Sequence, residues 1–248
     1  MYLKDKSYSI KPSEKLKYGF TLAEVLITLL VIGVVASMVI PALIQDSQKA
    51  ETVVQVKKYQ SILSQVVINI RNDYGSILNS PLNSNGDYVN GWKEIKPYLN
   101  LTKDCGTAIG QDCWANGMYK RLNGTNWADF NNYYVLGRGV MADGSSIDYE
   151  ARTNCNVNFS INNLEPLNSV CGDFIIDVNG HKPPNQAGRD VFSWHVTRNG
   201  NIYPDGSFDD KFGGCDPTSN DITYDANGAP GWGAGCTAKI IKEGKIDY

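Results

Sequence analysis

An uncharged apolar run of 20 residues, VLITLLVIGVVASMVIPALI at positions 25–44, constrains this chain most strongly. At about 1.5 Å per residue, a helix of that length spans the roughly 30 Å hydrocarbon core of a bilayer. A secretory signal peptide is the alternative, because Val34-Val35-Ala36 resembles a cleavage site. The apolar core of a signal peptide, however, normally has only about 7 to 15 residues, fewer than this run. We therefore expect residues 20–44 to form the transmembrane part of an N-terminal helix.

Charge is distributed unevenly on the two sides of this run. Residues 1–19 hold five lysines and two acidic residues, whereas the whole 248-residue chain has a formal net charge of -3. A basic N-terminal side predicts a single-pass protein of the cytoplasmic (inner) membrane, with its N-terminus inside and its head periplasmic or extracellular. The acidic body lacks a Lys/Arg cluster, so the charge predicts no nucleic acid binding.

Glu24 is the one acidic residue at the start of the apolar segment. A carboxylate inside a bilayer costs about 2.5 to 3.5 kcal/mol at the centre, and no cation lies on the same helix face within one turn downstream. If the chain were cut after Gly19, the new Phe20 ammonium would offer a partner. Glu24 of one subunit could then neutralise Phe20 of another as helices pack together. The sequence thus predicts an assembly role for Glu24.

The stretch GFTLAE at residues 19–24, followed by the apolar run with Gly33 and Pro41, resembles the N-terminal methylation motif of type IV pilins and type II secretion pseudopilins. The resemblance is specific over residues 15–45 and becomes one of general architecture beyond them. It implies a basic leader at residues 1–19, longer than is common in the family. It also implies that a prepilin peptidase cuts after Gly19 and methylates the Phe20 amine, and that Glu24 sets subunit registration.

Gly33 and Pro41 mark the weakest part of the expected helix. Proline cannot donate a backbone hydrogen bond, and glycine lowers helix propensity. The resemblance implies that this segment loosens within filaments. An ordinary proline-kinked membrane helix is the alternative, because bilayers tolerate such prolines.

Residues 45–74 continue the helix in amphipathic form. They contain no Gly or Pro, and Tyr74-Gly75 predicts the end of the helix. Lys57, Lys58 and Arg71 are expected on the solvated face. Six residues recur near one face at helical spacing: Val53, Val56, Gln60, Leu63, Val67 and Ile70.

Residues 75–248 change from the helical to the strand period and predict a β-rich globular head. Residues 191–204 predict a hairpin with a two-residue turn at Asn199-Gly200. Further strands are expected around Asp143-Gly144 and at residues 173–178. GWKEIKPYL predicts a short helix, and the rest of 75–132 is expected to be loop. The fold class is therefore α+β, with a long N-terminal helix packed on a small antiparallel β-sheet, and it resembles the pilin fold.

All cysteines lie beyond the apolar run, on the expected oxidising side, and their even number favours disulfides that staple the loops. Six cysteines allow 15 pairings, among which the sequence does not choose, although nearest-neighbour pairing closes the shortest loops. A metal site is the alternative, but no C-x-x-C occurs. The cysteines are Cys105, Cys113, Cys155, Cys171, Cys215 and Cys236.

The loop 177–190 gathers oxygen-bearing side chains between two expected strands. Asp177, Asn179, Asn185 and Asp190 could converge on a hard cation such as calcium, although the spacing is not that of an EF-hand. The alternative is that these residues cap turns through the backbone. Calcium is the one cofactor that the sequence suggests, and none is required.

The sequence indicates a structural subunit that polymerises into a type IV pilus or a type II secretion pseudopilus. Its expected partners are prepilin peptidase, other pilin or pseudopilin subunits, the assembly machinery and the inner membrane. An adhesin-like minor pilin with a ligand-binding head at a filament tip is the alternative. An envelope enzyme is the third hypothesis, but no catalytic motif appears, and His195 is expected at a half-exposed strand position. The prediction is that the protein is not an enzyme.

Overall fold

The computed structural model describes residues 19–83, 88–132, 137–159, 166–208, 215–222 and 231–248. Most of the expected leader, residues 1–18, lies outside them. The chain divides into two compact units, Met1–Asp46 and Ser47–Tyr248. A single helix, α1 (Leu22–Tyr74), contributes to both units. The division falls close to the expected boundary between the transmembrane and amphipathic parts of that helix.

In the first unit, α1 exposes its apolar side chains. Phe20 is 89% exposed, and the leucine, isoleucine and valine side chains from Leu22 to Ile44 are largely exposed. Among the described residues this is the one helix long and apolar enough to cross a membrane. Gly33 and Pro41 both lie inside α1, which continues through them. Their expected loosening within a filament stays a prediction.

In the second unit, the outer half of α1 buries one apolar stripe and ends at Tyr74, where Gly75 takes a φ of 72°. Five of the six residues predicted for this face are buried; Gln60 is half-buried, and its side-chain oxygen accepts the Trp194 indole N–H at 2.9 Å. Lys58, expected to be only solvated, forms an ion pair with Asp143. The buried residues are Val53, Val56, Tyr59, Leu63, Val66, Val67 and Ile70.

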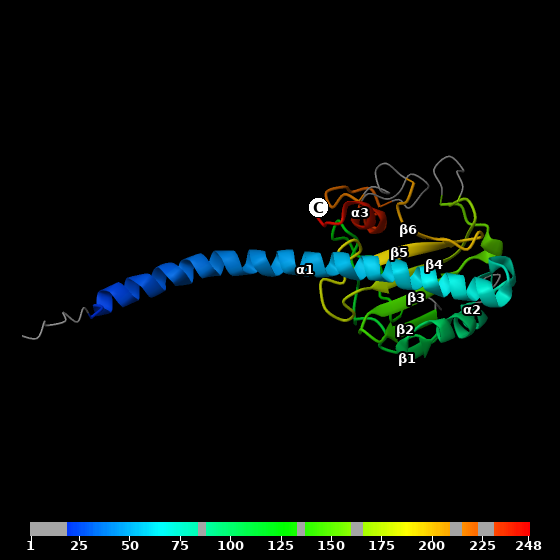
Figure 1. Ribbon diagram of the computed structural model, residues 1–248, viewed down its shortest axis with the longest axis horizontal. Helices are drawn as coiled ribbons and strands as arrows, with labels where there is room; N and C mark the ends of the chain where they lie inside the picture. Colours follow the sequence, from blue (N-terminus) through cyan, green and yellow to red (C-terminus); the bar gives the residue numbers. More distant parts are fainter. Residues whose placement is uncertain (1–18, 84–87, 133–136, 160–165, 209–214, 223–230) are drawn as a thin grey trace, which may run out of the picture. The chain divides into compact units, whose positions relative to one another are not determined.

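The outer half of α1 lies across a six-stranded antiparallel sheet whose strand order follows the sequence (Figure 1). The α+β fold expected from the sequence is therefore confirmed. The strands are β1 (Leu101–Gly106), β2 (Gly137–Met141), β3 (Ser146–Ala151), β4 (Val170–Asp177), β5 (Val191–Thr197) and β6 (Ile202–Pro204). The remaining helices are η1 (Ile77–Asn79), η2 (Pro81–Asn83), α2 (Tyr88–Ile95), η3 (Lys96–Tyr98), η4 (Thr153–Cys155) and α3 (Cys236–Glu243).

The β5–β6 hairpin is present, but its expected two-residue turn is wrong. The Thr197 N–H donates to the Asn201 carbonyl at 3.0 Å, and the Gly200 N–H donates back to the Thr197 carbonyl at 2.9 Å. The loop therefore consists of residues 198–200, and Gly200 supplies its positive φ of 76°. Such loops combine a type I turn with a left-handed glycine, which preserves the strand twist. Gly144 ends the β2–β3 loop in the same way.

Strand β1, helix α3 and the short helices η1, η2 and η4 were not expected from the sequence. Strand β1 lies in the segment predicted to be loop, and only Cys105 of its residues is buried, so it lacks a clear alternating pattern. Helix α3 is short and begins without a side-chain cap at Gly235. The short helix predicted near Trp92 is α2, continued by η3.

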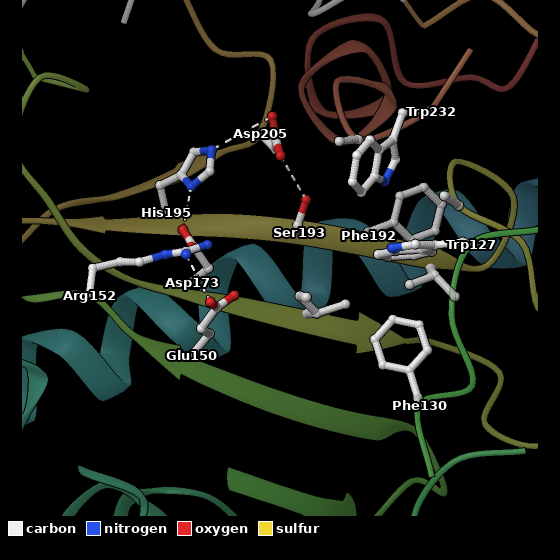
Figure 2. Close-up of a pocket in the computed structure, with 14 residues that line it drawn as sticks. Trp127, Phe130, Glu150, Arg152, Asp173, Phe192, Ser193, His195, Asp205 and Trp232 are labelled. Carbon is white, nitrogen blue, oxygen red and sulfur yellow. Dashed lines mark hydrogen bonds and ion pairs between the residues drawn. The ribbon is translucent and has the colours of Figure 1, made fainter. Parts of the chain in front are cut away.

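The sheet has two differently covered faces because neighbouring side chains on a strand point in opposite directions. Phe174 and Ile176 of β4 pack in the core that includes α1, whereas Ile175 packs in a separate cluster with Trp114 and Phe130. We call the face that carries Ile175 the outer face. Along it, charged residues of β3, β4 and β5 lie beside apolar ones (Figure 2).

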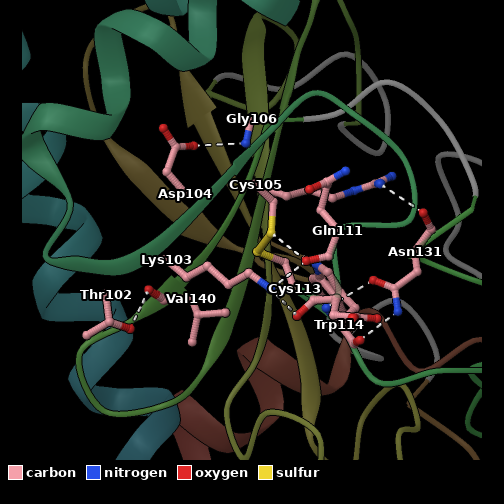
Figure 3. Close-up of a disulfide and its surroundings, with 12 residues drawn as sticks. Thr102, Lys103, Asp104, Cys105, Gly106, Gln111, Cys113, Trp114, Asn131 and Val140 are labelled. Carbon is pink, nitrogen blue, oxygen red and sulfur yellow. Dashed lines mark hydrogen bonds between the residues drawn. A yellow bond between two sulfur atoms is a disulfide. The ribbon is translucent and has the colours of Figure 1, made fainter.

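Three disulfides staple the head. They join Cys105 to Cys113, Cys155 to Cys171 and Cys215 to Cys236, which is the nearest-neighbour pairing. The first ties the end of β1 to the outer-face cluster (Figure 3). Close by, Lys103 Nζ donates to the Gln111 carbonyl at 2.5 Å. These contacts hold a loop in place that has no regular secondary structure of its own.

All six cysteines should be unreactive when oxidised protein from the cell envelope is unfolded and titrated with a thiol reagent. Reduction should lower the melting temperature, because removal of a native disulfide from a small exported domain typically costs about 2 to 5 kcal/mol. Alkylated protein that was first reduced is the control for full reactivity. Several free thiols in the unreduced sample would contradict the pairing.

Candidate functional site

The cleavage and assembly residues predicted from the sequence meet at the start of α1. Gly19 and Phe20 precede the helix, and Glu24 lies in its first turn. The Glu24 carboxylate accepts both the backbone N–H and the hydroxyl of Thr21, each at 2.8 Å. The Glu24 N–H donates in return to the Thr21 hydroxyl oxygen at 3.2 Å. This reciprocal pattern is a capping box, which satisfies donors at the first helical turn.

The capping box gives Glu24 a local partner that the sequence interpretation missed. Its signal was present as Thr21-Leu22-Ala23-Glu24, which fits the pattern of a small hydroxyl residue followed three positions later by Glu. Glu24 therefore has two candidate roles. It caps the helix within its own chain, and it is a candidate partner for a Phe20 ammonium in another chain.

A helix with an exposed apolar N-terminal part, joined to a disulfide-stapled antiparallel head, has the layout of a pilin-like protein. A family model described as the prokaryotic N-terminal methylation motif matches residues 15–40. This motif is the signature of type IV pilins and pseudopilins, so the resemblance inferred from the sequence is confirmed. No curated protein and no solved structure matches the chain. The motif supports a prepilin-like protein with a membrane anchor.

The loop between β4 and β5 brings the four predicted calcium ligands close to one another. The Asp190 carboxylate accepts the backbone N–H groups of Asn185 (2.7 Å) and Gln186 (2.6 Å), and also the Asn179 side-chain amide (3.3 Å). The Asp177 carboxylate accepts the Tyr119 hydroxyl at 2.8 Å and the Asn179 N–H at 3.2 Å. These contacts support turn capping by the two carboxylates.

Two features of the same loop favour a cation. The side-chain oxygens of Asn179 and Asn185 are buried without a hydrogen-bond partner in the described part of the chain. Burial raises the pKa values of Asp177 and Asp190, and for Asp177 repulsion from Asp190 adds to the effect. A bound cation would relieve that repulsion. Within the described ranges, no group of three or more His, Cys, Asp or Glu residues could hold a metal ion, so calcium would depend on the two amide oxygens.

We propose that this loop binds calcium. The test is the melting temperature of metal-stripped, oxidised protein with and without calcium. Calcium should raise the melting temperature by mass action on the native state, and Asp177→Ala should abolish the shift. Asp216→Ala, at an exposed turn outside this loop, is the matched control and should keep it. An unchanged melting curve of the wild-type protein in millimolar calcium would refute the calcium site, and turn capping would be the role of Asp177 and Asp190.

His195 is buried, and the expectation of a half-exposed position is wrong. Its Nδ1 lies 2.6 Å from an Asp173 oxygen, and its Nε2 lies 3.6 Å from an Asp205 oxygen. Burial disfavours the imidazolium, but the Asp205 and Asp173 carboxylates outweigh it and raise the pKa of His195 to about 10. This pKa favours the protonated ring at neutral pH, whereas a general base needs a pKa close to the operating pH.

Proposed function

We propose that the chain is a prepilin that is cut after Gly19 and polymerises through its N-terminal helix into a type IV pilus or a type II secretion pseudopilus. The methylation motif at residues 15–40 carries this proposal, because the motif implies a prepilin peptidase substrate and pilin assembly. The Glu24 carboxylate of one subunit would then pair with the Phe20 ammonium of a neighbouring subunit. Other subunits, the assembly machinery and the inner membrane are the partners.

The exposed apolar surface of the first unit supports the proposal. Side chains such as Leu26, Leu30 and Ile40 are more than half exposed. Apolar surface of this extent is stabilised when it leaves water, whether in lipid or against similar helices. A single-pass orientation, with the head periplasmic or extracellular, agrees with the lysines of residues 1–19 and with the three disulfides.

The adhesin-like alternative has one observation in its favour, a cavity with aromatic walls on the outer face of the head. Filament images of cells with and without the protein would separate the two functions. A shaft subunit is needed along the whole filament, whereas a tip module is found only at one end.

The mature protein should begin at Phe20 and carry one N-terminal methyl group. Intact-mass measurement of membrane-extracted protein checks this, with cells that lack an active prepilin peptidase as the control. Those cells should yield the uncut chain. A mature chain that begins near Ser37, or an uncut chain in cells with the active peptidase, would refute the assignment.

Glu24→Ala should insert into the membrane more favourably than the wild type but assemble poorly. Insertion improves because a charge within the apolar segment is removed, and assembly weakens because the Phe20 ammonium loses its partner. The measurement is filament yield from cells that make only the variant, with the membrane-bound amount as reference. Normal yield would exclude the registration role.

Two further variants separate registration from capping at this site. Glu24→Gln removes the charge but retains an oxygen acceptor, whereas Thr21→Ala removes the capping hydroxyl at a typical cost of about 0.5 to 2 kcal/mol and keeps the charge. Registration predicts low filament yield for Glu24→Gln and substantial yield for Thr21→Ala. The opposite ranking would assign Glu24 to helix capping.

A further inference from the structure

The outer face of the sheet contains a cavity of about 270 Å³. Its lining comes from β3, β4 and β5, from the segment around Trp127 and Phe130, and from Trp232 and Ala234. Ligand pockets typically measure about 300 to 1,000 Å³. This cavity is therefore of a size for one small ring rather than for a peptide or a polymer chain. It lies on the side of the sheet opposite to the α1 core and uses none of the residues of the methylation motif.

One wall of the cavity is aromatic. Trp127 meets Phe130 edge to face, with ring centroids 4.8 Å apart, and meets Trp232 at 5.7 Å. The Arg121 guanidinium lies over the Trp232 ring at 5.2 Å and helps to fix its orientation. Both indoles are half-buried and line the cavity, so part of their apolar surface is available to a ligand. Figure 2 shows these rings together at one end of the cavity.

The opposite end is polar and begins with an arginine between two carboxylates. Arg152 Nη1 lies 2.8 Å from a Glu150 oxygen, and Nη2 lies 2.5 Å from an Asp173 oxygen. Glu150 and Asp173 are directly paired across β3 and β4, so the sheet register sets their spacing. The arginine is held in one position by these contacts, and it is not free to pair with an external anion without losing them.

The polar end continues through His195 toward the aromatic wall. Asp173 contacts the imidazolium on one side and Asp205 lies on its other side. The Ser193 hydroxyl donates to the second Asp205 oxygen at 3.0 Å. Figure 2 shows Ser193 and Asp205 between His195 and Trp232. The hydrogen-bonding groups of His195, Asp205 and Ser193 are thus held in place next to the aromatic wall, as in preorganised binding sites.

The charges of the polar end nearly balance. Glu150, Asp173 and Asp205 face the cations Arg152 and His195. An anionic ligand would meet an excess of carboxylates, and a cationic ligand would have to displace Arg152 or His195 from their ion pairs. A neutral ligand with several hydroxyl groups avoids both costs, because each hydroxyl can donate to a carboxylate and accept from an N–H or O–H.

We infer that this cavity binds one neutral sugar ring. The C–H face of the ring stacks on the Trp127 indole, while the Trp232 ring, inclined by 70° to it, meets the edge of the sugar. The hydroxyl groups of the sugar bond to Asp205 and Ser193 at the polar end. Aromatic surface supplies apolar contact at low entropic cost, while the fixed polar groups select the arrangement of hydroxyls. The inference deepens the adhesin-like alternative and does not depend on cleavage, methylation or polymerisation.

The test uses the oxidised full-length protein in phosphatidylcholine nanodiscs, which carry no sugar head groups. The probes are the methyl glycosides of glucose, galactose, mannose and N-acetylglucosamine, titrated by saturation-transfer NMR. At least one probe should bind saturably, with its strongest transfer on ring protons of one face. Trp127→Ala should weaken binding by about tenfold or more, and Trp127→Phe should retain part of it.

Two controls keep the result interpretable. Phe208→Ala removes an exposed aromatic ring outside the cavity and should leave binding unchanged, and melting curves should confirm that each variant is folded. No binding of any glycoside, or binding that Trp127→Ala leaves unchanged, would overturn the inference. So would saturable binding of tetramethylammonium without any glycoside, because the cavity would then be a cation site.

Discussion

Burial of one apolar stripe of α1 against the sheet is the interaction on which the head depends. Each fully buried Val, Leu or Ile contributes about 1.5 to 3 kcal/mol, which helps to offset the cost of ordering the backbone. Polar contacts then fix where the stripe lies. The Tyr59 hydroxyl donates to Asp143 in the β2–β3 loop at 3.0 Å, and Gln60 accepts from Trp194 on β5. The helix is thereby tied to two hairpins at once.

Because α1 covers only one face, the rest of the chain must cover the other. It does so with loops, and the Cys105–Cys113 disulfide lies in their apolar cluster, whereas Cys155 and Cys171 belong to the core that includes α1. Cys113 joins the aromatic cluster of Trp114 and Phe130, whose rings stack at 4.3 Å. Where that layer ends, the outer face carries charged residues that neutralise one another. A site on this face is therefore made of fixed side chains on strands, with aromatic rings supplied by the covering loops.

Local patterns predicted the elements that local forces determine. Helical spacing located the buried stripe from Val53 to Ile70, and glycine located both hairpin loops. The outer-face layer could not be predicted, because its order depends on contacts between distant segments. His195 illustrates this: a polar residue in a strand usually faces water, and the residues that bury it, such as Phe159 stacked at 4.5 Å, follow no periodic pattern. The methylation motif and the apolar surroundings predicted an assembly role for Glu24. Its capping role could also have been predicted, because Thr21 lies three residues before it.

The division of the chain into two compact units allows assembly and recognition to be separate properties. Residues proposed for assembly lie in the first turn of α1 and along its exposed apolar segment, within the first compact unit. The cavity is lined by strands and loops of the second unit and by no residue of α1. Sites without shared partners usually act additively. Changes around Glu24 should then act on membrane insertion and filament formation but not on ligand binding, and changes around Trp127 should act on ligand binding but not on filament formation. Selection can therefore alter the cavity without disturbing the helix.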